Sequence, residues 1–235
     1  MTRKRNKHLM RNIGITVAVI IVIAVASAAA ICLDKPSQTP QIAPSTPLAV
    51  GDTFTYKLAG STVLGNSSVV TPQEFLEYND TDYYQVTVTA VEGTQVTLET
   101  TWQFKNGTQV SEPQAIDLST GLTGDVMGFV YLYPSNLSVT DKLYPQDSNQ
   151  LMVNSTSTQR FGDSSRVINY WSTEDQYMNT GDQSGNTMRY DFIGVNFDRD
   201  TGMLVSLTRI EFLTNPEIQL TITWQLTSTN VWNVK

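Results

Sequence analysis

The sequence predicts an all-β domain, an antiparallel sheet that is either curved into a half-barrel or folded as a sandwich, preceded by one N-terminal transmembrane helix. Three observations lead to this prediction. A charge-free apolar segment follows a basic N-terminus, a proline-rich stretch comes next, and the remainder alternates between apolar and polar residues. Alternation with a period of two is typical of antiparallel strands that bury one face. The chain therefore divides into a basic tail over 1–12, a membrane segment over 13–33, a linker over 34–49 and a β domain over 50–235.

The apolar segment runs from Ile13 to Leu33 without a charged side chain. As a helix it would span roughly 31 Å, enough to cross the core of a bilayer. The basic residues before it should stay in the cytoplasm, so that the β domain faces outward as a cell-envelope domain. A cleaved signal peptide is the alternative, because small residues at alternate positions between Ala24 and Ala30 offer cleavage sites. Both interpretations place the domain outside the cytoplasm.

The linker over 34–49 holds four prolines among serine, threonine and glutamine residues. Such a composition favours extended polyproline conformations. At full extension it could hold the domain up to roughly 50 Å from the membrane.

The β domain is divided into strands by its alternating pattern and its turn residues. Two turns are predicted, at Asn106-Gly107, where both residues tolerate a positive φ, and over Asp198–Gly202. The region 111–151 is rich in turn residues and is left unassigned, apart from a short helix or strand over 126–133, and 173–186 is predicted to be a long exposed loop. No other helix is predicted outside the membrane segment. Strands are predicted over 53–59, 84–90, 95–104, 165–172, 193–197, 203–213 and 218–226, with a short edge strand over 231–234.

Charge and composition exclude several functions for the domain. After Leu33 the chain has 10 basic and 22 acidic residues, a net charge of −12 that would repel the phosphates of a nucleic acid. The only histidine is His8 and the only cysteine is Cys32, and both precede the domain. Catalysis by Ser-His-Asp or Cys-His groups is therefore excluded there, as are ordinary zinc, copper and haem sites. No cofactor is predicted, and we expect the domain not to be an enzyme.

Carboxylates are the remaining catalytic groups. Two of them, one acid and one base or nucleophile, could hydrolyse a glycoside. The sequence does not select a pair, and surface solvation accounts for the acidic residues equally well. The candidates are Glu174, Asp175, Asp182, Asp191 and Glu211.

Three further sets of residues are candidate sites. Tyr190 and Phe192 are candidates for ligand binding, because their strand is apolar on both faces. Asp198 and Asp200 place oxygen ligands at alternate positions, as a calcium loop does, although a hairpin turn explains the same residues. Sequons for N-linked glycosylation suit exposed loops in an extracytoplasmic domain. They begin at Asn66, Asn79, Asn106, Asn136 and Asn154.

Two short motifs resemble known proteins. They are Val50-Gly51-Asp52-x-x-x-Tyr56 and Phe197-Asp198-x-Asp200-Thr201-Gly202-x-Leu204. Both are similar to segments of uncharacterised membrane-anchored or secreted archaeal β-rich proteins, and the second also resembles hairpins of curved-sheet lipoprotein carriers. The resemblance implies an antiparallel curved sheet at the cell surface. It implies no catalytic residue.

Together these observations favour a non-enzymatic, membrane-anchored cell-envelope protein that binds an apolar ligand, such as a lipid, or a protein partner. The alternative is a structural or adhesive surface module without a ligand. A carboxylate-dependent glycoside hydrolase is the third alternative. A ligand carrier should offer an apolar surface or cavity, whereas an adhesive module should have a filled core and an exposed edge or patch.

Overall fold

A computed structural model describes residues 44–65, 70–71, 73–121, 131–147, 150–179, 187–214 and 217–234. All of them belong to the second of two compact units, Ala43–Lys235. The basic tail, the predicted transmembrane helix, most of the linker and Asn66 lie outside the described residues. Within the described ranges, no helix combines the length and the apolar character that a membrane crossing needs.

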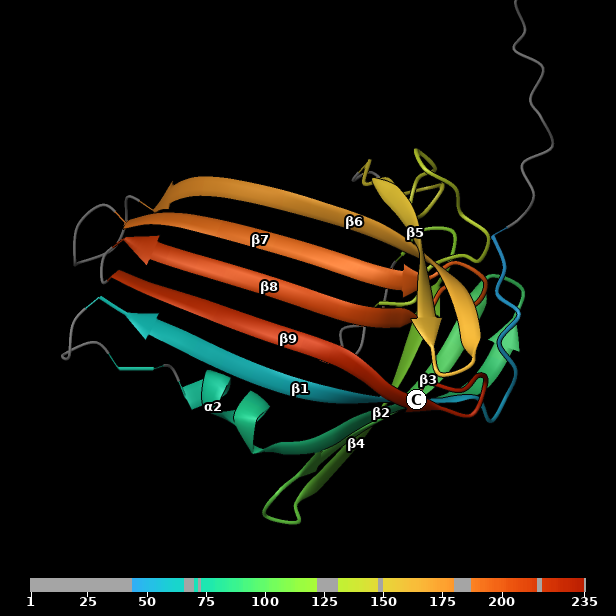
Figure 1. The fold of residues 1–235 in the computed structure, drawn as a ribbon, viewed down its shortest axis with the longest axis horizontal. Helices are drawn as coiled ribbons and strands as arrows, with labels where there is room; N and C mark the ends of the chain where they lie inside the picture. The colour runs from blue at the N-terminus through green and yellow to red at the C-terminus, as the bar shows by residue number, and fades with distance from the viewer. Residues whose placement is uncertain are drawn as a thin grey trace, which may run out of the picture. The chain divides into compact units, whose positions relative to one another are not determined.

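The described part of the chain forms one open antiparallel sheet (Figure 1). Its nine strands follow the order β4-β3-β2-β1-β9-β8-β7-β6-β5. The prediction of an all-β antiparallel fold is therefore confirmed, whereas the sandwich alternative is wrong because all nine strands belong to one sheet. The strands are β1 (Thr53–Leu64), β2 (Thr81–Glu92), β3 (Gln95–Phe104), β4 (Gln109–Asp117), β5 (Ser155–Phe161), β6 (Ser164–Asn179), β7 (Thr187–Asp198), β8 (Leu204–Thr214) and β9 (Glu217–Thr229).

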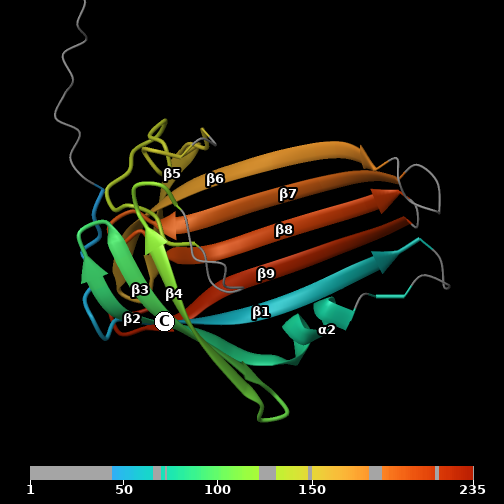
Figure 2. The same cartoon turned by 180° about the vertical axis from the view of Figure 1, so that it is seen from behind.

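The sheet bends where β1 and β2 separate. These strands pair only between Thr53–Tyr56 and Tyr84–Thr87, after which β1 continues beside β9. Figures 1 and 2 show β1 and β6–β9 running side by side as long strands, while β2–β4 turn away at one end. Strands from both parts contribute to one buried core, which includes Val86, Leu98, Val195 and Leu207. We call the side of the sheet that carries this core the inner face, and the opposite side the outer face.

Strict alternation produces the inner face. In β2 and β3 the predicted apolar face is confirmed, since Val86 and Val88 are fully buried and pair with Thr100 and Leu98 of β3. The same alternation continues through β9, where Leu226 is buried beside Tyr56 of β1. Burial of these side chains supplies the main driving force for folding in a domain without disulfides.

One helix interrupts the β structure. Helix α2 (Gln73–Asp80) connects β1 to β2 and was not predicted. Its Phe75 is buried against Ile218, Leu220 and Ile222 of β9, so the helix covers part of the inner face of the long strands. The sequence did not predict this helix, because eight residues make too few turns to show a helical period.

The polar strands were the hardest to predict. Residues 173–179, predicted to be a loop, belong to β6 and pair with residues 187–193 of β7. Their apolar partners stand on β7, where Phe192 pairs with Glu174 and Ile193 with Thr173. Strands β4 and β5 lie in the regions 111–151 and 152–164, to which no strand was assigned, and both are edge strands. An edge strand that buries few side chains lacks the apolar alternation by which strands are recognised.

The predicted edge strand over 231–234 is wrong. These residues form a bend that packs Trp232 against Phe54, with ring centroids 5.6 Å apart. Asn230 starts the bend, accepting a hydrogen bond from the Thr53 amide and donating one to the Gly51 carbonyl oxygen. Of the segment 126–133, residues 126–130 lie outside the described residues, and Leu132 makes a single bridge with Met203.

The last residues of the predicted linker lie against the domain. Leu48 is buried in the core, and the Thr46 hydroxyl donates a hydrogen bond to the Thr201 carbonyl oxygen. The backbone of Ser135 donates another to the Ser45 carbonyl oxygen. The described chain is thus attached to the sheet from residue 45 onward.

Candidate functional site

The outer face of the long strands carries no charged side chain between residues 190 and 196 of β7, 206 and 212 of β8, and 219 and 225 of β9. Pairing fixes this face, because Phe192 stands opposite Ile210, which stands opposite Thr221. Charged residues make up 16% of the chain, so a random set of twelve residues would include about two of them. The uncharged region is therefore a distinct surface. Its side chains are Tyr190, Phe192, Gly194, Asn196, Ser206, Thr208, Ile210, Phe212, Gln219, Thr221, Thr223 and Gln225.

Four apolar side chains gather at one end of this surface. Phe192 pairs with Ile210, and Tyr190 pairs with Phe212. All four are half-buried although none of the described strands and helices lies over them on this side. Next to them on the same face, Val63 of β1 pairs with Gln219 and is 65% exposed. We call Tyr190, Phe192, Ile210 and Phe212 the outer patch.

The two sequence-predicted ligand residues, Tyr190 and Phe192, therefore lie together in the outer patch. They face away from the core. Burial and the neighbouring Glu174, with which the Tyr190 hydroxyl forms a hydrogen bond, raise the pKa of Tyr190. The hydroxyl therefore stays protonated at neutral pH and acts as a hydrogen-bond donor beside an otherwise apolar surface.

Beside the outer patch runs a row of small residues. Ser172, Gly194, Thr208, Thr223 and Ala59 pair in sequence across the five long strands. At the glycine, an added Cβ atom would stand 3.0 Å from the Phe192 ring and 3.2 Å from the Tyr170 hydroxyl oxygen. The Phe192 ring therefore packs over Gly194. The small side chains of the row form a shallow strip of hydroxyl and methyl groups beside the outer patch, which we call the hydroxyl strip.

The inner face of the same strands has the opposite character. Arg189 donates to Asp191 at 3.2 Å and to Glu211 at 3.0 Å, and Arg209 donates to Glu211 at 2.7 Å. Asp191 and Glu211 stand directly opposite each other on β7 and β8, and Asp175 stands opposite Asp191 on β6. We call Arg189, Asp191, Arg209 and Glu211 the ionic cluster.

The ionic cluster contains two of the five candidate carboxylates for glycoside hydrolysis. Asp191 and Glu211 are brought together, Asp175 is adjacent and exposed, Glu174 lies on the outer face, and Asp182 is outside the described residues. A glycosidase needs one carboxyl group that holds a proton. Here Arg189 contacts both carboxylates, an arrangement that suits two charged groups. The cluster is therefore better explained as an ion-pair network between strands.

Removing one charge from the ionic cluster should destabilise the domain. Glu211→Gln takes away the charged acceptor shared by Arg189 and Arg209, and we expect the free energy of unfolding to fall by about 2 kcal/mol. Asp175→Asn is the matched control, because this residue is exposed on the same cross-strand row, and its effect should stay within about 0.5 kcal/mol. Urea unfolding of both variants measures the difference, and equal effects would contradict a stabilising role for the cluster.

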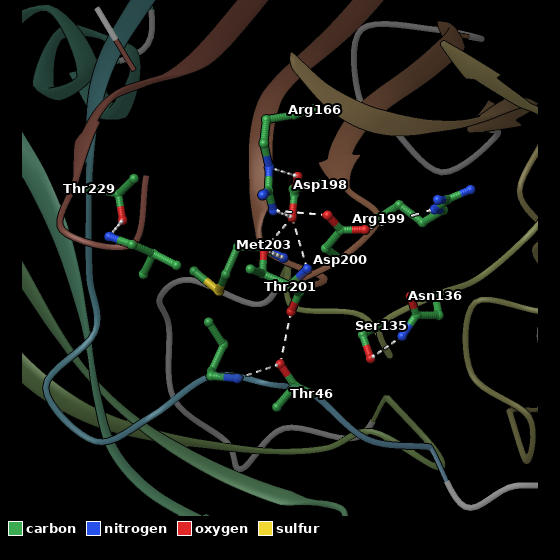
Figure 3. Close-up of polar contacts among 12 residues, drawn as sticks. Thr46, Ser135, Asn136, Arg166, Asp198, Arg199, Asp200, Thr201, Met203 and Thr229 are labelled. Carbon is green, nitrogen blue, oxygen red and sulfur yellow. Dashed lines mark hydrogen bonds and ion pairs between the residues drawn. The ribbon is translucent and has the colours of Figure 1, made fainter. Parts of the chain in front are cut away.

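The two candidate calcium ligands form part of the β7–β8 turn (Figure 3). Asp198 is fully buried, and its carboxylate oxygens accept hydrogen bonds from Arg166 at 2.7 and 2.8 Å. The amide and the hydroxyl of Thr201 donate to the same carboxylate at 2.8 Å each. Asp200 is half-exposed and lies 3.4 Å from Arg166. Among the described residues, no group of three or more His, Cys, Asp or Glu residues is placed to hold a metal ion.

The turn is thus built around an arginine. The guanidinium of Arg166 fills the place beside Asp198 that a cation would take, and it also lies 4.7 Å from the centre of the Trp232 ring. The hydrogen bonds and the charge of Asp198 raise the pKa of Arg166. The aspartate therefore acts as the anchor of a tight turn, as the hairpin interpretation of the sequence has it.

A polar cleft of about 480 Å³ opens where β1 and β2 diverge. Lys57, Asp82, Tyr83 and Lys105 line it together with Asn79. The Lys105 ammonium donates to the Asn79 carbonyl oxygen at 2.5 Å, which ties the β3–β4 turn to the end of α2. With charged side chains around an open mouth, this cleft does not suit an apolar ligand.

The described sequon asparagines are all exposed, but they differ in their contacts. Asn79 lies in the last turn of α2, Asn106 lies in the β3–β4 turn, Asn136 lies in the loop after Leu132, and Asn154 precedes β5. Sequence analysis predicted loops for these positions, and the structure places Asn106, Asn136 and Asn154 outside helices and strands but Asn79 within α2. The sequence does not show which of these side chains form hydrogen bonds with the rest of the fold.

Neither a protein-family model nor a curated protein sequence matches the chain. The fold itself defines an all-β domain built on one open antiparallel sheet.

Proposed function

We propose that the protein is a non-enzymatic, membrane-anchored module of the cell envelope that binds an apolar ligand or a protein partner on the outer face of its sheet. The observation that carries the proposal is the outer patch, four half-buried apolar side chains on uncharged stretches of β7 and β8, with Glu174 of β6 at their side. A group of apolar side chains on the surface with polar residues beside it is typical of a binding site.

Electrostatics favour the outer patch as a binding surface for an apolar group. The chain after Leu33 carries a net charge of −12, so most of its surface repels anionic or similarly acidic partners. Over β7 and β8 an apolar group can approach the outer patch without desolvating a charge, and desolvation of a charge is a costly step in forming an interface. Glu174, opposite Phe192 on β6, is a charged residue at the side of the patch. The hydroxyl strip along Thr208 and Thr223 supplies hydrogen-bonding groups at the side of the patch.

The N-terminal apolar segment supports placement at a membrane. Leu33 ends that segment, and residue 45 is already attached to the sheet, so the intervening chain could extend over roughly 40 Å at most. A domain tethered at that distance meets its ligand or partner at a high effective concentration.

Native mass spectrometry of the full-length protein, released in mild detergent from membranes of its own cells, tests the proposal. We expect a bound lipid or a protein partner at a fixed stoichiometry, confirmed by lipid extraction or peptide analysis of the same sample. The variant Phe192→Gln, Phe212→Gln should lose the bound species. A bare monomer in the unaltered protein would contradict the proposal, and a homo-oligomer that survives the double substitution would favour the structural or adhesive alternative.

A further inference from the structure

Four sequons lie in the described part of the chain, and the fold uses their side chains to very different extents. An enzyme that transfers a glycan must take the acceptor segment into its own active site, so exposed tips that leave the fold easily are the favoured sites. Two features decide access for each sequon, namely the contacts of the asparagine amide and those of the serine or threonine hydroxyl.

In the sequon at Asn79, both the asparagine amide and the threonine hydroxyl form hydrogen bonds with the fold. The Asn79 side-chain oxygen accepts a hydrogen bond from the Gly60 amide at 3.0 Å, and its Nδ2 donates to the Gly60 carbonyl oxygen at 2.6 Å. The hydroxyl of Thr81 donates to the Glu77 carbonyl oxygen and accepts a hydrogen bond from the Trp102 indole. Thr81 is also buried.

Amide geometry makes the Asn79 contact incompatible with a glycan. In a pair of hydrogen bonds formed by one amide edge, the donating hydrogen lies on the same side as the amide oxygen. A glycosylated asparagine is a planar secondary amide, and its sugar carbon takes that same position, as Cα does in a trans peptide. A glycan on Asn79 would therefore replace the hydrogen that binds Gly60 and push α2 away from β1.

Two other sequons are also held by the fold. Asn154 accepts a hydrogen bond from the Ser172 amide, and the hydroxyl of its partner Thr156 donates to Asn169. At Asn136 the backbone amide donates to the Arg199 carbonyl oxygen, and the next residue, Leu137, accepts a hydrogen bond from Asn169. Both segments would have to leave the sheet or its covering loop to reach an enzyme.

Asn106 differs from these three. It lies at the tip of the β3–β4 hairpin, which projects past the neighbouring strands in both views (Figures 1 and 2). Its side-chain oxygen accepts a hydrogen bond from the Thr108 amide, whereas its Nδ2 and the Thr108 hydroxyl have no hydrogen-bond partner among the described residues. Gly107, between Asn106 and Thr108, has a φ of +87°. No atom lies within 4 Å of the position of an added Cβ, so the turn is open on that side.

We infer that Asn106 is the N-glycosylation site of the described domain and that Asn79 is a structural residue that stays unmodified. The inference rests on the proposed placement of the domain outside the cytoplasm. The donor is an oligosaccharide linked to a lipid phosphate or pyrophosphate. The bond between Asn106 Nδ2 and the sugar C1 forms, the bond between C1 and the phosphate oxygen breaks, and Nδ2 loses one proton as the lipid phosphate leaves.

Peptide mass spectrometry of the full-length protein from membranes of its own cells tests the inference through the occupancy of each asparagine. A control variant, Asp163→Asn, completes a new sequon with Ser165 at the exposed β5–β6 turn. We expect glycan on Asn106 and on the new site, and an unmodified Asn79. A modified Asn79 would overturn the inference, as would a bare Asn106 beside a modified control site. Absence of glycan from Asn106 and the control site alike would also overturn the inference, whereas the proposed function is tested separately by the bound species in native mass spectrometry.

The structural role of Asn79 has its own test. Asn79→Gln removes the paired hydrogen bonds to Gly60 and should lower the melting temperature of the protein by roughly 4 °C. Asn106→Gln is the matched control and should leave the melting temperature unchanged in unglycosylated protein. Equal melting temperatures for the two variants would overturn the structural assignment of Asn79.

Discussion

Replacing Gly202 by alanine should lower the free energy of unfolding of the β domain by more than about 4 kcal/mol, or prevent its folding. Gly202 has a φ of +79°, in the left-handed region that side chains avoid. It is also buried against the loop that fills the core, and its carbonyl oxygen accepts a hydrogen bond from the Tyr133 amide. A Cβ atom there would overlap the Tyr133 carbonyl oxygen, so the turn and the loop could not remain in contact.

Gly107→Ala separates the two causes of this effect. Gly107 has a similar φ of +87°, but an added Cβ meets no atom within 4 Å. Only the backbone strain remains, and the expected loss is about 1 kcal/mol. Urea unfolding monitored by tryptophan fluorescence compares the two variants, and a loss at Gly202 as small as that at Gly107 would contradict the packing described for the turn.

Asp198→Ala should cost about 3–5 kcal/mol of the free energy of unfolding. The substitution removes the fully buried carboxylate that accepts hydrogen bonds from Arg166 and from the amide and hydroxyl of Thr201. It also loosens the Thr201 backbone, whose carbonyl oxygen holds Thr46 at the start of the described chain. Figure 3 shows these contacts as one connected group.

Asp200→Ala is the control for this second prediction. Asp200 lies two residues away, is half-exposed and approaches the same arginine only to 3.4 Å. Its removal should change the free energy of unfolding by less than about 1 kcal/mol. If the two substitutions had equal effects, the buried ion pair would not be the anchor of the turn.

Much of the fold could be predicted from the sequence, because alternation survives wherever one face of a strand is buried. The strands around Val86, Leu98 and Leu226 display it clearly and were assigned correctly. It fails where both faces of a strand meet water or another polar group. The end of β6 and the exposed first parts of the edge strands β4 and β5 are of that kind, and their strand character comes from the partner strand. The sequence has no local signal for such long-range pairing.

The candidate site could be predicted only in part. Tyr190 and Phe192 were selected because their strand is apolar on both faces, and they do lie together on the outer face. Ile210 and Phe212 were placed in a strand, but only the pairing of β7 with β8 shows that they join the same patch. Pairing likewise brings Asp191 and Glu211 together and gives each an arginine partner. For Asp198, the partner Arg166 stands 32 residues earlier in the chain, beyond the reach of any motif.

Site-specific photo-crosslinking in intact membranes tests most directly whether the outer face is the binding surface. A photoreactive amino acid replaces Thr221, which pairs with Ile210 of the outer patch, or Thr173, a half-buried threonine on the inner face of β6. We predict that the probe at Thr221 yields one defined adduct with a lipid or a protein, and that this adduct disappears in the Phe192→Gln, Phe212→Gln variant. The probe at Thr173 should yield none. A defined adduct from Thr173 with none from Thr221 would contradict the proposal and assign binding to the inner face.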